Sequence, residues 1–425
     1  MFLVLINVIV RLRKSSFLIF LSFCLMGGLS LCLARSVSAQ DNSSPAQPSA
    51  ADPQLPKDAA QQPAATPPPE KKPEEKTEKT AEEKDDKEQK HHRGALVVAP
   101  LPIVSPAIGS GIIPVLGYIF PFQERDKVSP PSVVGAAGLI TNNGSRGFAL
   151  GGDLYMKENR YELKAAYFHG NIDYNLYGVG YANGSAGLKL PLEQTGEAFF
   201  IEFLRNIGWK VFVGGRFITG NSVVTLKPTS GDTPPIPPDV GLNTNLRALG
   251  MEVVRDTRPN RFYPVKGSLA DFTGDFFAHS LGSKYSFQSY KVTFNKYWSL
   301  NDKQVLAYNG FFCATGGQPP FYGNCIYGTN NELRGYTAGR YLDRYMFATQ
   351  LEYRLVLPWR LGLVGFGGLG EVAPGGDAFR TNQFLPAGGT GIHFLLSKKF
   401  HVNLRTDFAW GKDNFTWSMG VGEAF

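Results

Sequence analysis

The sequence predicts an all-β protein, a transmembrane antiparallel β-barrel of about sixteen strands. Polar and apolar side chains alternate along many segments, as they do along strands whose two faces meet different surroundings. Glycine and aromatic residues are abundant, with 48 Gly, 31 Phe and 18 Tyr among 425 residues. The mean hydropathy is only −0.15. A helical membrane protein would be far more apolar, because each span needs about 20 apolar residues in a row.

Residues 1–39 have the features of a secretory signal peptide. A basic segment, Arg11–Lys14, precedes an apolar run, Phe17–Leu33. Val37–Ala39 forms a small-x-small site, with cleavage expected before Gln40. An uncleaved anchor helix is the alternative interpretation.

Residues 40–94 form a low-complexity segment, which we expect to be a disordered periplasmic tail. Its first half is rich in Ala, Pro, Gln and Ser, and its second half, Glu70–Arg93, holds nine acids and eight bases. Such a composition has almost nothing to bury in a core. The formal net charge of +7 falls to +3 once the four positive charges of the signal peptide are removed. We therefore expect no binding of nucleic acid.

From Ala95 onward the alternation repeats, and the segment around residues 400–410 shows it best. One parity is mainly apolar and carries Phe400, Val402, Leu404, Phe408 and Trp410. The other is polar and carries His401, Asn403, Arg405 and Asp407. The first set would face lipid and the second the lumen, where opposite charges indicate a networked interior. A soluble β-sandwich or lipocalin-like barrel also alternates. However, about sixteen strands exceed the usual closure of a soluble barrel.

The expected strands follow one another with turn residues between them. Two flank the turn at 106–109, and a long loop at 317–342 separates the last five from the rest. The others are expected at 131–141, 146–157, 160–172, 192–205, 208–226, 240–256, 266–280, 284–300, 302–316, 343–357, 360–373, 385–398, 399–411 and 414–425.

Two cysteines, Cys313 and Cys325, remain after the signal peptide and lie on either side of a Gly- and Pro-rich stretch. In an oxidising compartment such a pair favours a loop-closing disulfide. A pair of free buried thiols is the alternative. No His lies near them in sequence, so we expect no metal site and no cofactor.

The last segment, 414–425, has the features of a C-terminal strand signal. One parity carries Trp417, Met419, Val421 and the terminal Phe425, and Glu423 interrupts the apolar face. Barrel-assembly machinery recognises a last strand of this kind.

Three motifs resemble the BamA/TamA-like superfamily of outer-membrane assembly factors, also called bacterial surface antigens. Segment 330–336, with Leu333-Arg334-Gly335-Tyr336, is similar to its Val-Arg-Gly-Phe/Tyr loop motif. Segment 255–267 looks like its periplasmic turn, and segment 366–371 like its Phe-x-Asp-x-Gly strand. The turn motif comprises Arg255, Asp256, Pro264 and Gly267. The resemblance covers about Ala95–Phe425 and implies that the chain lies in the bacterial outer membrane.

The resemblance implies that the loop folds into the lumen, where Arg334 pairs with an acid of the wall. Gly368 stands where the family usually has the Asp partner. A buried Arg needs an acceptor, so we expect Glu352, which faces the lumen by parity, to take that role. A solvated loop arginine is the alternative. The chain also departs from most members because no repeated periplasmic domains precede the barrel.

The family resemblance implies a role in inserting or translocating polypeptide, or lipid, without enzymatic chemistry. The expected partners are outer-membrane lipids, nascent outer-membrane or secreted polypeptides, and a periplasmic protein. A seam between strands 95–105 and 415–425 could open, because Pro100, Pro102 and Pro106 remove ladder donors. A passive pore or structural barrel is the runner-up. An outer-membrane enzyme is less favoured. The histidines of this chain are scattered, and no Ser/His/Asp spacing typical of a catalytic triad stands out.

Overall fold

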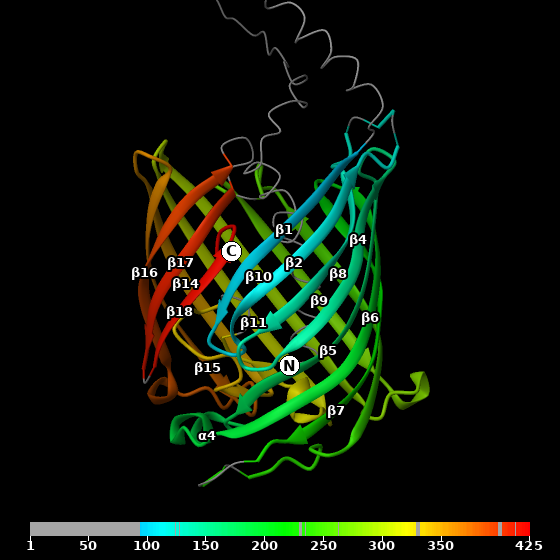
Figure 1. The fold of residues 1–425 in the computed structure, drawn as a ribbon, viewed down its shortest axis with the longest axis vertical. Helices are drawn as coiled ribbons and strands as arrows, with labels where there is room; N and C mark the ends of the chain where they lie inside the picture. Colours follow the sequence, from blue (N-terminus) through cyan, green and yellow to red (C-terminus); the bar gives the residue numbers. More distant parts are fainter. Residues whose placement is uncertain are drawn as a thin grey trace, which may run out of the picture. The chain divides into compact units, whose positions relative to one another are not determined.

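Sixteen antiparallel strands join edge to edge into one closed barrel in the computed structural model of the chain (Figure 1). The structure describes residues 94–425 apart from 124, 127, 229–231, 234, 262, 329–331, 398–401 and 413. The predicted fold class, a transmembrane-type antiparallel barrel of about sixteen strands, is confirmed. The predicted signal peptide at 1–39 and nearly all of the tail at 40–94 lie outside the described residues and stay predictions.

Each predicted strand has a counterpart in the wall. The barrel strands are β1 (Ala95–Ser105), β2 (Gly109–Phe120), β3 (Ser132–Thr141), β4 (Arg146–Met156), β5 (Tyr161–Leu176), β6 (Leu190–Gly208), β7 (Val211–Leu226), β8 (Asn243–Asp256), β9 (Gly267–Phe277), β10 (Phe287–Asn301), β11 (Gln304–Gly317), β14 (Tyr345–Val356), β15 (Leu361–Ala373), β16 (Leu385–Ser397), β17 (Val402–Gly411) and β18 (Phe415–Val421).

The connections contain short elements that the sequence analysis did not predict. A two-stranded hairpin, β12 (Cys325–Ile326) with β13 (Leu342–Asp343), lies between β11 and β14. The same connection holds the 3-10 turn η3 (Phe321–Gly323). The helix α4 (Tyr181–Ala186) and the 3-10 turns η2 (His279–Leu281) and η4 (Thr381–Gln383) lie in other connections. Each is too short to leave a periodic pattern in the sequence. Across the described part of the chain, no helix is long and apolar enough to cross a bilayer.

The alternation along the strands separates an outer face from the lumen. On β14, Gln350, Glu352 and Arg354 are buried, whereas Leu351 and Tyr353 between them are exposed. The partner strands keep the same phase, because β14 pairs in continuous register with β11 and β15. Charged side chains therefore line the interior and apolar side chains the exterior, as membrane barrels require.

Tight two-residue turns mark one end of the barrel. Trp209-Lys210 joins β6 to β7, and Trp359-Arg360 is the central pair of the turn 357–360 between β14 and β15, all four at positive φ. Positive φ at both central residues matches the twist of a hairpin. We call this end the periplasmic end and the end that carries loop 318–344 the extracellular end.

Candidate functional site

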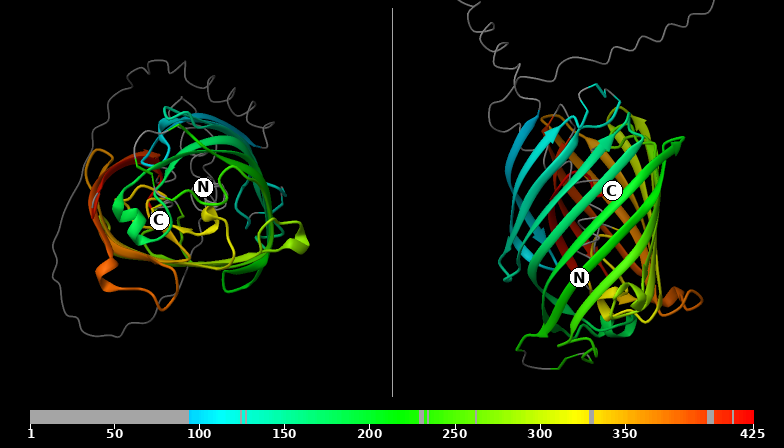
Figure 2. Two further views of the ribbon diagram at one scale, coloured as in Figure 1. Left: turned by 90° about the horizontal axis from the view of Figure 1, so that it is seen from below. Right: turned by 90° about the vertical axis from the view of Figure 1, so that its right-hand side faces the viewer.

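Loop 318–344, between β11 and β14, folds into the lumen instead of standing out from the rim. Figure 2, in the view from below, shows this segment inside the ring of strands. Leu333, Arg334 and Tyr336 are all buried. The sequence-predicted loop motif thus lies within the barrel, next to its wall.

Arg334 is surrounded by groups from three wall strands. Its guanidinium pairs with Glu352 of β14 and lies 3.1 Å (Nη1 to Oδ2) from Asp407 of β17. Its Nε donates to Gln350 Oε1 at 3.3 Å. The guanidinium carbon lies 3.5 Å from the ring centroid of Phe366 on β15. Two carboxylates, an amide and an aromatic face together compensate a cation taken out of water. We call Arg334 and these four wall residues the arginine lock.

Two glycines allow the loop to come this close to the wall. Gly335 has a φ of +110°, and a Cβ there would lie 3.0 Å from the Cβ of Ala387. A Cβ on Gly368 would lie 2.7 Å from Leu333 Cδ1. The glycine at the position of the family's Asp therefore makes room for Leu333, and the acids come from other strands.

The arginine lock continues into a closed ring of ion pairs. Glu352 also accepts from Arg354 Nε at 2.6 Å, and the same nitrogen lies 3.3 Å from Glu423 Oε2. Glu423 lies 3.3 Å from His393 Nδ1, whose Nε2 lies 3.4 Å from Asp407 Oδ1. The ring links β14, β16, β17, the C-terminal residues and, through Arg334, the lumen loop.

The periplasmic turn motif is held by its own charges and then joins this network. Asp256 accepts from Arg258 Nε at 2.9 Å and Nη2 at 2.8 Å. Pro264 O accepts from Arg354 Nη1 at 3.4 Å, so the turn reaches the lumen wall. Gly267, at a φ of +95°, leaves no room for a Cβ beside Thr257 O. Arg255 instead points to the turn of Trp209, whose carbonyl oxygen accepts from its Nε at 3.4 Å.

The C-terminal strand signal needs a correction. Alternation predicts a last strand that reaches 425, with Phe425 on its apolar face, but β18 ends at Val421. Gly422 has a φ of +86° and turns the chain, and Phe425 O then accepts from Arg354 Nη2 at 3.2 Å. Glu423 consequently leaves the apolar face and accepts from Asn403 Nδ2 at 2.6 Å.

The part of the predicted strand signal that lies within β18 does face outward. Trp417 is exposed, Met419 is half-buried and Val421 is buried against its neighbours. The end of the chain, labelled C, lies inside the ring in the view from below of Figure 2. The outward surface of β18 is therefore shorter than the sequence predicted.

The base of the lumen loop is tied to the wall by a disulfide between Cys313 of β11 and Cys325 of β12. Beyond it, Tyr336 packs edge-on against Tyr327 and Tyr341. The hydroxyl of Tyr336 donates to Pro386 O at 2.7 Å. The loop is thus fixed at its base, at its tyrosines and at Arg334.

The opposite lumen wall carries a second charge network. Arg216 of β7 pairs with Asp275 of β9 and lies 3.9 Å from both Glu202 and Glu252. Lys164 of β5 pairs with Glu162 and lies 3.4 Å from Glu202. The lumen is therefore lined by mutually paired charges of both signs.

The seam between the first and last strands is weakly paired. Among the described residues, β1 and β18 share one pair, Val104 with Met419, whereas β1 and β2 pair along the whole of β1. Pro100 lies opposite Pro114 in the β1–β2 ladder. Two prolines cannot exchange N–H···O bonds, so theirs is a non-hydrogen-bonded position, and the even-numbered nitrogens of β1 point toward β18.

Pro100 and Pro102 therefore remove two donors on the side of β1 that faces the seam. Pro114 has the same effect on the other side of β2, because its missing donor faces β3. The β2–β3 ladder runs from Gly111 to Ile112, and resumes only at Val115. Pro106 lies after the end of β1, in the turn to β2.

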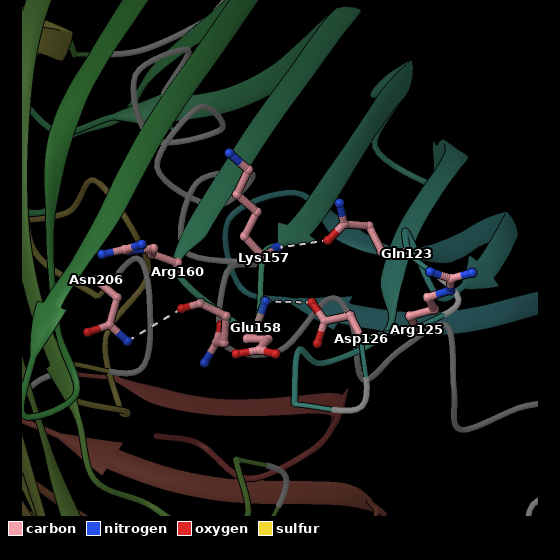
Figure 3. Close-up of a pocket in the computed structure, with 8 residues that line it drawn as sticks. Gln123, Arg125, Asp126, Lys157, Glu158, Arg160 and Asn206 are labelled. Carbon is pink, nitrogen blue, oxygen red and sulfur yellow. Dashed lines mark hydrogen bonds between the residues drawn. The ribbon is translucent and has the colours of Figure 1, made fainter.

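A cavity of about 970 Å³ lies away from the arginine lock, at the periplasmic end (Figure 3). Its polar groups hold the turn at 157–160. Asp126 Oδ2 accepts from Glu158 N at 2.6 Å, and Gln123 Oε1 from Lys157 N at 3.2 Å. A hydrogen bond from Ser129 lowers the pKa of Asp126 to about 2. The polar residues that line this cavity therefore serve to stabilise the turn at 157–160.

Parity predicts Glu352 as a partner of Arg334, and the structure brings those two together. The other three partners, Asp407, Gln350 and Phe366, were not predicted from the sequence. Parity had already placed Asp407 on the lumen face, but no local signal tells which lumen residues of distant strands meet a loop. That information lies in the closure of the barrel.

A family model, the Omp85 superfamily domain, matches residues 143–425. Among solved structures, BamA from Haemophilus ducreyi lacking POTRA domains 1–3 is similar, at 14% identity and a TM-score of 0.53. That match covers 78% of this chain and 70% of the BamA chain without those domains. CdiB from Acinetobacter baumannii matches at 13% identity and a TM-score of 0.49, over 78% of this chain and 59% of CdiB. No curated protein matches significantly.

Proposed function

This chain belongs to the Omp85 superfamily of bacterial outer-membrane barrels, and we propose that it inserts or translocates a polypeptide client through a seam that opens between β1 and β18. The family match bears out the resemblance predicted from the three motifs. Insertion and transport are the role of the family. The client and the moving seam are the proposal.

The observation that carries the proposal is the contrast between the lumen and the seam. The lumen holds loop 318–344, the arginine lock and the C-terminal residues, which supports a plugged barrel and not an open diffusive channel. The seam instead has one described strand pair, and its β1 side lacks the donors of Pro100 and Pro102. The least costly place to open this wall is therefore between β1 and β18.

An opened seam leaves strand edges whose free N–H and C=O groups can pair with an incoming strand. A client hairpin would add to β18, which keeps its donors, more readily than to the proline-containing edge of β1. The periplasmic end, where the turns at Trp209 and Trp359 are exposed, offers a surface for a periplasmic partner. The predicted tail at 40–94 could recruit such a partner.

The test is a reversible disulfide cross-link, here called a clasp, between β1 and β18 across the seam. Val104→Cys with Met419→Cys places two thiols on directly opposed residues, where a disulfide can form. We expect the oxidised variant to stop complementing a depletion strain and the reduced variant to complement it. The control pair, Val98→Cys with Leu116→Cys, clasps β1 to β2. Equal activity of both oxidised variants would contradict a moving seam.

A passive pore is the second candidate, favoured by the closed barrel alone. It needs neither a mobile seam nor an occupied lumen. Oxidation of the Val104/Met419 clasp would leave the conductance of a passive pore unchanged, and complementation would persist.

A further inference from the structure

A polar pocket opens on the outer face of the barrel near its extracellular end. It has a volume of about 690 Å³ and lies beside Gly282. Its polar lining residues are Asn221, Asn243, Asn245, His279, Ser283 and Lys284. We call it the rim pocket. Nothing in the proposed insertion function uses it.

The rim pocket faces outward, not into the lumen. On β8, Thr244, Leu246 and Ala248 are buried inside. Asn243, Asn245 and Arg247 have the opposite parity and share the outer face with Leu249 and Met251, which are 53% and 45% exposed. The outer face of β8 thus changes from apolar to polar at Arg247.

The height of the rim pocket matches a lipid headgroup region. Asn221 pairs with Asn245, and Val211 pairs with Arg255 beside the exposed Trp209 of the periplasmic end. From Val211 to Asn221 the strand advances by about 33 Å. With a tilt of about 40°, this is about 25 Å along the membrane normal, the height of the apolar band of such barrels.

The loop between β9 and β10 folds over this polar face and adds a cation, Lys284, to Arg247 of β8. Lys284 N donates to Asn245 O at 2.8 Å, and Lys284 Nζ to Asn243 O at 2.9 Å. Arg247 Nη1 donates to Leu281 O at 3.4 Å and lies so close to Gly282 that a Cβ there would be 2.6 Å away. Lys284 thus lines the rim pocket, and Arg247, also exposed, lies at its edge beside the lining residue Gly282.

The other groups of the rim pocket are hydrogen-bonding ones. His279 Nδ1 lies 2.9 Å from Ser283 O, which leaves Nε2 for a ligand. Asn245 Oδ1 is buried and has no hydrogen-bond partner among the described residues. Glu197, the acid beside Asn221, accepts from Tyr167 OH at 2.8 Å and from Asn221 Nδ2 at 3.5 Å. Its carboxylate is thus held by these two donors at the edge of the rim pocket.

We propose that the rim pocket binds the headgroup of a phosphorylated glycolipid of the outer leaflet. Lys284 and Arg247 attract the phosphate, and the three asparagines hydrogen-bond sugar hydroxyls. The acyl chains lie along Leu249 and Met251. Apolar side chains lie on the membrane side of the rim pocket and cations on its extracellular side. This arrangement matches a lipid better than a soluble anion.

The test is retention of lipid by the purified full chain. The probes are lipopolysaccharide, its dephosphorylated form, phosphatidylglycerol and inorganic phosphate. Native mass spectrometry measures bound lipid, and heat-modifiability on gels measures protection. The variant is Arg247→Gln with Lys284→Gln. The control, Lys210→Gln with Arg360→Gln, removes two exposed cations at the periplasmic end.

We expect wild type and control to retain lipopolysaccharide, and the Arg247/Lys284 variant to bind it at least tenfold more weakly. Dephosphorylated lipid should bind as weakly to wild type. Equal retention by all three proteins, or protection by inorganic phosphate alone, would overturn the assignment. If the double variant does not fold, the single Lys284→Gln change carries the test, with at least threefold weaker binding expected and unchanged binding contradicting the proposal.

Discussion

Arg334 and Asp407 are 73 positions apart in sequence, yet Nη1 of the one lies 3.1 Å from Oδ2 of the other. Asp407 belongs to β17, which pairs with β18 along the strand that forms the seam. The lumen loop is therefore fastened one strand away from the place where the wall is weakest. This contact connects the loop that fills the lumen with the strands of the seam that is proposed to open.

The first prediction concerns that contact. Removing one partner of a buried ion pair costs about 3–5 kcal/mol, because the remaining charge is left uncompensated. Arg334→Ala and Asp407→Ala should each lower the temperature at which the barrel unfolds on gels, and the double variant should lose less than the sum. Additive losses would show that the two side chains do not act together.

The second prediction concerns Gly368. Its Cβ would meet Leu333 at 2.7 Å and Thr349 O still closer, so Gly368→Ala should destabilise the barrel by about 1–3 kcal/mol. Gly365, on the same strand, has nothing within 4 Å of its Cβ position. Gly365→Ala is therefore the matched control, and an equal effect of the two changes would contradict the packing described for the loop.

The third prediction concerns the disulfide at the base of the loop. It closes a loop of 12 positions, for which a stabilisation of about 3 kcal/mol is typical. Reduction should lower the unfolding temperature and make the lumen loop sensitive to added protease. Cys313→Ala with Cys325→Ala should behave like the reduced wild type and respond no further to reductant. Protease resistance in both states would mean that the disulfide does not secure the loop.

The fourth prediction concerns the C-terminal residues. Glu423→Gln removes a charge that faces both Arg354 and His393. It should destabilise the barrel by about 1–3 kcal/mol. Glu158→Gln changes an exposed acid of the periplasmic turn and should have no measurable effect. If the two variants unfold alike, the C-terminal residues are not part of the lumen network.

Much of this architecture could be predicted from the sequence, because alternation is a local signal. All sixteen strands, the burial of Glu352 on the lumen face and the position of the long loop follow from parity and turn residues. The turn after Val421 was missed because Phe425 continues the apolar parity by coincidence. Only the left-handed conformation of Gly422 ends the strand there.

The candidate site was less predictable than the wall. The Arg334–Glu352 pair joins residues near in sequence, so parity and proximity were enough to propose it. Asp407 comes from β17, His393 from β16 and Glu423 from the residues after β18, and they join the network of Arg334 only after the barrel closes. Their roles as partners depend on side-chain reach across the lumen, which no strand pattern encodes.

The most direct test of the central claim is the planar-bilayer conductance of the full-length protein, wild type beside Arg334→Ala, with Arg360→Ala as the exposed control. A plugged barrel held by the arginine lock predicts small, fluctuating conductance for wild type and control, and large, steady conductance for Arg334→Ala. Large, steady conductance in all three proteins would contradict the plug and favour a passive pore.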